Sequence, residues 1–227
     1  MQAQDSTTLF FLKLWPWLEA NKNRLIGGAV VAAVAIFIIW FMACQRASRE
    51  TAAGQALTQA SMSSGRTSAE GYLDIAKKYP GTIAGQRALL QGAAALFEAG
   101  KYPDAQAQFQ KYLDAHPDSD FSGQAAFGVA SSLAAQGKTD LAIGAYQRVI
   151  NSSSDAAAVN GAKFGLARIE ESQGKLNDAL VLYQDVANAS PGTSLGSDAG
   201  MRLMELRSKM PATAPATAPA VIPKSGQ

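Results

Sequence analysis

Few residues in this 227-residue chain are of the types that carry out catalysis or bind metals. There is one histidine, His116, and one cysteine, Cys44, so any site that needs several histidine or cysteine ligands is excluded. His116 precedes Pro117 at an expected helix end, where we expect it to have a cap or surface role. Glu170 and Glu171 are adjacent, so on a helix they point to different sides and cannot share a substrate. We expect them to form a solvated face.

The remaining polar residues show no catalytic pattern either. The glycines form no phosphate-binding loop after a strand, and the serines at 152–154 are expected in a loop. The sequence therefore predicts a protein that is not an enzyme, with no catalytic residue, cofactor or metal site. The first 44 residues hold three of the 20 Lys and Arg residues and two of the 18 Asp and Glu residues. The rest is close to neutral and has no basic run, which argues against nucleic acid as a partner.

An uncharged apolar segment, Leu25–Cys44, is the most distinctive local feature. Its 20 residues span about 30 Å as a helix, the thickness of the hydrocarbon core of a bilayer. We predict a transmembrane helix in contact with membrane lipid. The alternative is a buried helix of a soluble protein. The anchor residues that we single out are Leu25, Gly28, Ala32, Ile36 and Trp40, in which Gly28 and Ala32 have the spacing that lets another helix approach closely.

Cleavage after the apolar segment is a second alternative. Residues 41–44 resemble a lipoprotein processing site, but Phe41 and Met42 are bulky and the site is far from the N-terminus. We therefore expect an uncleaved anchor and leave lipidation of Cys44 open. Residues 1–24 are expected to form a cytoplasmic or interfacial segment. No proline interrupts residues 25–53, so we expect the membrane helix to continue unbroken into the first repeat.

Residues after the anchor repeat with a period of 37. The positions linked by this offset are Gly100, Gly137 and Gly174; Ala93, Ala130 and Ala167; Ala105, Ala142 and Ala179; and Phe109, Tyr146 and Tyr183. Each repeat is expected to contain two helices, such as Thr82–Ala99 and Pro103–Ala115, joined at a glycine that ends the first helix. The alanines let the two helices pack closely, and the aromatic residues fill the space between successive repeats.

These repeats predict an all-α solenoid, because one helix pair cannot bury its apolar face alone. We expect about four helix pairs over residues 45–209, with a degenerate first repeat at 46–79 and a capping helix at Ser197–Lys209. The Pro/Ala/Thr composition of residues 210–227 predicts a disordered tail.

The second half of each repeat resembles a tetratricopeptide repeat. The matching residues are Gly100, Tyr102, Ala105 and Phe109, followed by Pro117. The family repeat is usually 34 residues long, so a period of 37 implies slightly longer helices or loops. The resemblance implies a protein that binds other proteins.

The whole layout is similar to a narrower family. A segment with the residues LKLWPW at 12–17 precedes an anchor that ends near Trp40, and the repeat domain follows. This resembles the bacterial membrane-anchored tetratricopeptide family that forms an ancillary subunit of the SecYEG translocon. The resemblance implies a bacterial inner-membrane protein with a cytoplasmic N-terminus and periplasmic repeats. It also implies secretion-channel subunits, a periplasmic chaperone or exported clients as partners. The repeats are similar as well to envelope proteins of the outer-membrane assembly and cell-division coordinator type.

The first helices of successive repeats are expected to line the concave face of the solenoid. Leu90, Phe127 and Phe164 occupy one repeat position there, and we refer to them as the apolar row. The residues expected nearby are Arg87, Phe97, Ser131 and Arg168. We predict a groove for an extended or helical segment of a partner, with ordinary core packing as the alternative. Two functions remain open: an adaptor or chaperone-like factor for exported proteins, and a structural scaffold subunit of another membrane complex.

Overall fold

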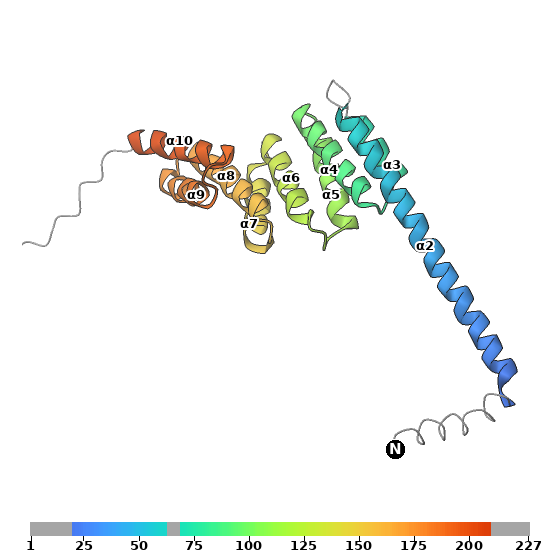
Figure 1. Cartoon of the computed structure of the whole chain (residues 1–227). Helices are drawn as coiled ribbons and strands as arrows, with labels where there is room; N and C mark the ends of the chain where they lie inside the picture. The colour runs from blue at the N-terminus through green and yellow to red at the C-terminus, as the bar shows by residue number, and fades with distance from the viewer. Residues whose placement is uncertain (1–19, 63–68, 210–227) are drawn as a thin grey trace, which may run out of the picture.

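The computed structural model describes residues 20–62 and 69–209 (Figure 1). These residues form nine α-helices and no strand, so the all-α prediction is confirmed. In chain order the helices are α2 (Lys22–Met62), α3 (Ala69–Lys78), α4 (Ile83–Glu98), α5 (Tyr102–Ala115), α6 (Ser122–Ala135), α7 (Thr139–Ser152), α8 (Ala156–Ser172), α9 (Leu176–Ala189) and α10 (Ser194–Lys209). The expected tail at 210–227 and most of the segment expected at 1–24 lie outside the described residues.

The helices stack as consecutive pairs, and Figure 1 shows the stack extending sideways from one end of α2. The distal half of α2 pairs with α3, and the pairs α4–α5, α6–α7 and α8–α9 follow, with α10 packed on α9. The first helices also contact one another across repeats, α2 with α4, α4 with α6, and α6 with α8. Neighbouring first helices contact one another more than neighbouring second helices do, so the first helices form the inner, concave layer. The predicted solenoid of four helix pairs with a capping helix is confirmed.

The first helices α4, α6 and α8 are each followed by a glycine that ends the helix, as predicted. Gly100, Gly137 and Gly174 have φ values of 76°, 74° and 77°, in the left-handed region that favours glycine. After α4, the N–H of Gly100 donates to the carbonyl of Phe97 and the N–H of Lys101 to that of Leu96, both at 2.9 Å. These bonds satisfy carbonyl groups that the helix leaves free at its end. The chain can therefore turn sharply into the second helix.

Aromatic residues of the second helices fill the space between repeats, as the period predicted. A Cβ added at Gly128 of α6 would lie 2.6 Å from the ring of Phe109. A Cβ at Gly165 of α8 would lie 2.5 Å from the ring of Tyr146. Glycine at these positions lets each buried ring pack directly on the backbone of the next repeat.

Helix α2 continues without a break from the apolar segment into the repeat stack, as predicted. Its residues from Val30 to Met62 include an 18-residue stretch with a mean hydropathy of 2.0, none of which is buried. Ile36 and Trp40 are 67% and 62% exposed. Gly28 and Ala32 are also exposed, whereas the side chain of Leu25 lies outside the described ones. A core helix of a soluble protein would be covered, so the apolar half of α2 has the length and exposure of a membrane anchor or a signal sequence.

Glu50 joins α2 to the repeats. Its carboxylate accepts hydrogen bonds from the backbone N–H groups of Ile83 and Ala84 at 2.9 and 3.0 Å. These are two of the N–H groups that the first turn of α4 leaves without a helical partner. Three residues further along α2, Ala53 is fully buried. The distal half of α2 therefore packs against the repeats.

The capping helix α10 begins at Ser194, three residues before the expected Ser197. The side chain of Thr193 accepts a hydrogen bond from the N–H of Gly196 at 3.0 Å. A threonine that caps the first turn in this way fixes the start of the helix. The expected start was wrong by almost one turn because this cap was overlooked.

Candidate protein-binding surface

The three residues of the apolar row differ in exposure. Leu90 of α4 is 3% exposed and belongs to the hydrophobic core. Its inclusion in the binding surface is therefore corrected, because it presents almost no area to a partner. Phe127 of α6 and Phe164 of α8 are half-buried. Phe164 packs edge-on against Tyr183 with ring centroids 5.4 Å apart, so one side of its ring is fixed by the core.

Met201 of α10 continues the apolar row and was missed by the sequence analysis. It lies one period of 37 residues after Phe164, and its side chain is 62% exposed. Adding one more period to the row would have found it. Exposure in the row is thus lowest at Leu90 and highest at Met201, which lies on the last helix in the described part of the stack.

A hollow of about 580 Å³ lies between α8 and α10 at this end of the row. The residues that line it are Phe164, Arg168, Asp198, Met201, Arg202 and Glu205. Phe164 and Met201 give it an apolar part with charged groups around it. We refer to these six residues as the α8–α10 surface. Apolar anchors surrounded by polar groups are typical of sites where a protein segment binds.

Two charged groups of the α8–α10 surface form an ion pair with each other, and two do not. Glu205 accepts hydrogen bonds from Lys209 Nζ at 2.6 Å and from Arg202 Nη1 at 3.1 Å. The bond from Lys209 is the main cause that lowers the pKa of Glu205. Arg168 and Asp198 are exposed, and among the described residues no ion pair engages either one. These two side chains are free to bind polar groups of a partner.

Two tyrosine hydroxyl groups connect the inner and outer layers near this surface. The hydroxyl of Tyr183 donates to Glu171 Oε2 at 2.8 Å, and that of Tyr146 donates to Ser131 Oγ at 3.3 Å. Burial raises the pKa of both tyrosines, and the bond to Glu171 raises that of Tyr183 further. The hydroxyl of Ser131 is therefore already bonded to Tyr146, on the side of α6 that faces the core. Arg168 carries a positive charge close enough to favour ionisation of both tyrosines, although burial outweighs it.

The expected solvated face at Glu170 and Glu171 is wrong in part. The side chain of Glu170 is only 13% exposed and lies 3.0 Å from Lys175 Nζ. Glu171 is the acceptor of the Tyr183 hydroxyl. Both carboxylates thus take part in packing between α8 and α9, and as expected they do not point to a common site.

Arg87 and Phe97 lie on α4, two repeats away from α8. The guanidinium of Arg87 is 5.3 Å from the centre of the Phe121 ring. The ring of Phe97 is 5.1 Å from that of Tyr102. Both side chains are engaged within the first complete repeats, and the structure does not bring them together with Phe164 and Arg168.

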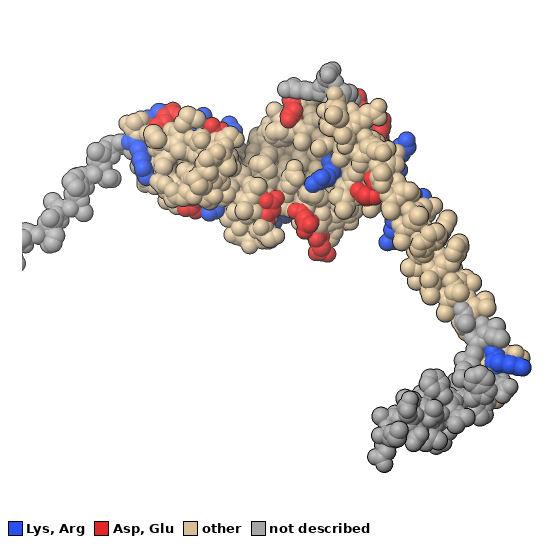
Figure 2. Space-filling view, in the orientation of Figure 1, with Lys and Arg blue, Asp and Glu red and all other residues tan. Residues whose placement is uncertain are grey.

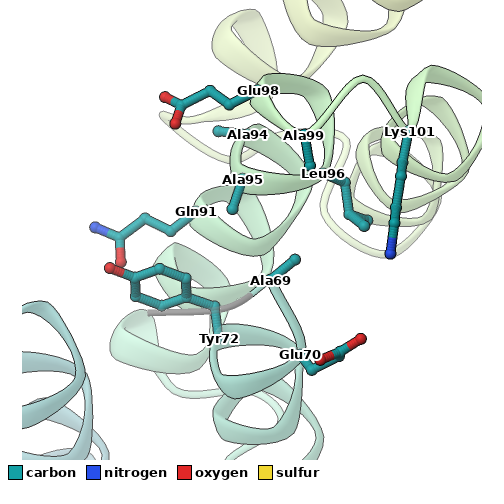
Figure 3. Close-up of a pocket in the computed structure, with 10 residues that line it drawn as sticks. All are labelled: Ala69, Glu70, Tyr72, Gln91, Ala94, Ala95, Leu96, Glu98, Ala99 and Lys101. Atoms are coloured by element: carbon teal, nitrogen blue, oxygen red, sulfur yellow. The ribbon is translucent and has the colours of Figure 1, made fainter. Parts of the chain in front are cut away.

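A second hollow, of about 480 Å³, lies between α3 and α4 (Figure 3). Tyr72 has the repeat position of Phe109, and Gln91 has that of Gly128. Figure 3 shows Tyr72 and Gln91 next to each other at this hollow. In this repeat the glycine that contacts the preceding helix is Gly92, one residue later, and the side chain of Leu73 packs on it, while Tyr72 is only half-buried. The hollow therefore follows from imperfect packing of the degenerate first repeat.

Groups for catalysis do not gather in the described part of the chain. No three His, Cys, Asp or Glu side chains there are close enough to hold a metal ion. His116 ends α5, where its N–H donates to the carbonyl of Tyr112 at 2.9 Å, and its ring lies 5.2 Å from that of Tyr112. The expectation that His116 lies at a helix end is confirmed.

Comparison with known protein families matches residues 16–145 to the tetratricopeptide repeat-like domain. This match covers more than half of the chain and begins ahead of the apolar half of α2. A solved structure described as "MamA RS-1 ArsTM double mutant" is similar at a TM-score of 0.48 and 17% sequence identity, over 71% of this chain and 96% of that chain. No curated protein matches the chain.

Proposed function

The chain belongs to the tetratricopeptide repeat-like family, and on that premise we propose that it is a membrane-anchored adaptor that binds a segment of another protein at its α8–α10 surface. The observation that carries this proposal is the exposed end of the apolar row. Phe164 is held edge-on by Tyr183 while Met201 is 62% exposed, on a hollow with unpaired charges at Arg168 and Asp198. A partner that fits would present an apolar side chain between flanking polar groups, on an extended or helical segment.

The apolar half of α2 acts as an uncleaved anchor in this proposal. Cys44 lies within the unbroken helix, so processing there would cut α2 in the middle. The family match starts at residue 16, so the apolar helix belongs to the region that the family shares. Glu50 and Ala53 engage the same helix in the repeat core. All three points favour a permanent anchor over a signal sequence that is removed.

We propose further that the repeats face the periplasm of a bacterial inner membrane and that the N-terminus is cytoplasmic. Three basic residues precede the anchor, and two follow it within five residues. This small bias favours a cytoplasmic N-terminus. The resemblance to the ancillary translocon subunit points to the same arrangement. Secretion-channel subunits, a periplasmic chaperone and exported proteins are the partners that this arrangement makes available.

Site-specific photo-crosslinking tests the proposal. A photoreactive amino acid replaces Phe127 or Phe164 in the full chain, and the adducts formed in native membranes are identified by mass spectrometry. We expect adducts with secretion-channel subunits, a periplasmic chaperone or several exported chains. A single dominant adduct with an unrelated membrane complex would refute the adaptor and favour a structural scaffold subunit. The outer-helix residue Val181, 63% exposed on α9, is the control position.

A further inference from the structure

The turn between α3 and α4 differs in charge from the same turn in later repeats. Residues 77–83 hold Lys77, Lys78, Tyr79 and Ile83 and no acidic residue. One period later, residues 114–120 hold three aspartates and no Lys or Arg. Two periods after that, residues 188–194 hold no charged residue. Only the turn nearest to α2 is therefore both basic and apolar.

Helix α2 fixes the height of this turn above the anchor. Glu50 binds the N–H groups of Ile83 and Ala84 directly, so the turn lies level with Glu50. Glu50 follows Cys44, the last residue of the apolar segment, by six residues, or about 9 Å along a helix. The headgroup layer on each side of a bilayer is about 5–8 Å thick. The turn is consequently placed at the outer edge of the headgroups.

The side chains of the turn are available at that level. Ile83 is 59% exposed, and the side chain of Lys77 is 72% exposed. Lys78 is also exposed, with its Nζ 5.4 Å from the centre of the Tyr79 ring. Asp74, which lies 3.3 Å from Lys77 Nζ, is the acidic neighbour, while Glu50 is occupied by the N-terminus of α4.

Two arginines of α2 extend the basic surface downward. Arg46 and Arg49 are exposed, one turn or less from Glu50. Figure 2 shows Lys and Arg side chains where α2 meets the stack, with some Asp and Glu side chains among them, and further Asp and Glu side chains on the underside of the later repeats. Four basic groups thus lie at the level of the lipid phosphates. The corresponding turn of the next repeat carries aspartates instead, which anionic phosphates repel.

We propose that the α3–α4 turn, together with Arg46 and Arg49, binds the phosphates of anionic phospholipid headgroups. Tyr79 and Ile83 enter the interface beside them, as aromatic and apolar residues do at membrane surfaces. This inference rests on the proposed anchoring of α2 in a bilayer.

Fluorescence quenching in lipid nanodiscs tests this contact with the full chain. In a Cys44→Ser background, single cysteines at Phe41, Ile83 or Asp120 carry a small fluorophore. Asp120 is the matched control, because it has the position of Ile83 one repeat later. Nitroxide groups are placed either on the lipid headgroup or in the middle of the acyl chain. The discs contain phosphatidylglycerol or only phosphatidylcholine.

We expect headgroup nitroxides to quench position 83 strongly in phosphatidylglycerol and position 120 weakly. The double variant Lys77→Gln/Lys78→Gln removes exposed charges only, and circular dichroism checks its fold. Each lysine near an anionic surface contributes about fivefold in binding, so this variant is expected to lower quenching at position 83 toward the phosphatidylcholine level, with Arg46 and Arg49 retaining part of the contact. Equal quenching at 83 and 120, or no effect of the variant, would overturn the inference.

The label at position 41 separates the two proposals. Phe41 lies in the apolar half of α2 and is 55% exposed, so acyl-chain nitroxides quench it if the helix spans the bilayer. Quenching at 41 without headgroup quenching at 83 leaves the anchor standing and refutes the headgroup contact. Failure at position 41 refutes the anchor and the headgroup contact with it.

Discussion

Replacing Glu50 by glutamine is expected to destabilise the repeat domain although Glu50 lies on the anchor helix. The carboxylate accepts hydrogen bonds from Ile83 and Ala84 at 2.9 and 3.0 Å. A glutamine keeps one acceptor oxygen, so one of the two bonds is lost along with the negative charge at the N-terminus of α4. A lost cap costs about 0.5–2 kcal/mol, and a charge at a helix terminus contributes about 0.3–1 kcal/mol. Because Glu50 is only half-buried and water can reach it, we expect a loss of about 1.5 kcal/mol.

Thermal unfolding of the full chain in detergent, followed by circular dichroism, measures this loss. For a domain of this size 1 kcal/mol changes the melting temperature by about 2–4 °C, so Glu50→Gln is expected to melt about 3–6 °C lower. The matched control is Glu98→Gln, an exposed carboxylate in the last turn of α4, at the opposite end from the turn that Glu50 binds. Hydrogen exchange at Ile83 and Ala84 is also expected to accelerate. Equal melting of wild type and Glu50→Gln would refute the view that Glu50 joins the anchor to the repeats.

Two further predictions concern packing, between repeats at Gly128 and within one repeat at Tyr183. Gly128→Ala is expected to destabilise the fold by about 2 kcal/mol because its Cβ would lie 2.6 Å from the ring of Phe109. Gly144→Ala, whose Cβ would have nothing within 4 Å, is expected to stabilise the fold by about 0.5–1 kcal/mol. Urea unfolding measures the free energy of unfolding of both variants, and a change of the same sign in both would contradict the packing described. Burial and the bond to Glu171 raise the pKa of Tyr183, so the folded state holds its proton more tightly than the unfolded chain, whose tyrosines titrate near pH 10. This contribution to stability is intact below about pH 10 and is lost as the pH rises above it. Melting temperatures measured from pH 8 to 11 are therefore expected to fall less steeply for Tyr183→Phe than for the wild type. Equal slopes for the two proteins would contradict the burial argument.

The period of 37 predicted most of the fold because its residue types have local physical causes. A glycine that must adopt positive φ, such as Gly100, and an aromatic that must pack on the next repeat, such as Phe109, each leave a mark in the sequence. Local geometry also predicted the unbroken course of α2, since it needed only the absence of proline.

Contacts between distant residues left no such mark. Glu50 binds N–H groups 33 and 34 residues away, and nothing in the residues around it indicates that partner. Leu90 and Met201 occupy equivalent positions, yet one is 3% and the other 62% exposed. Their difference depends on whether another repeat follows, which a residue type alone does not tell. The predicted binding surface therefore included Leu90, which is buried, and left out Met201, which is exposed.

The central claim is that a partner segment binds the α8–α10 surface. The most direct test compares Met201→Glu with Met204→Glu, two exposed methionines of α10 with exposures of 62% and 72%, of which only Met201 lines the hollow. The affinity of each full-length variant is measured for the partner identified by crosslinking. We predict that Met201→Glu weakens binding at least about tenfold, because a charged group that must be desolvated replaces the exposed apolar anchor, and that Met204→Glu binds like wild type. Equal affinities of the two variants would contradict the account.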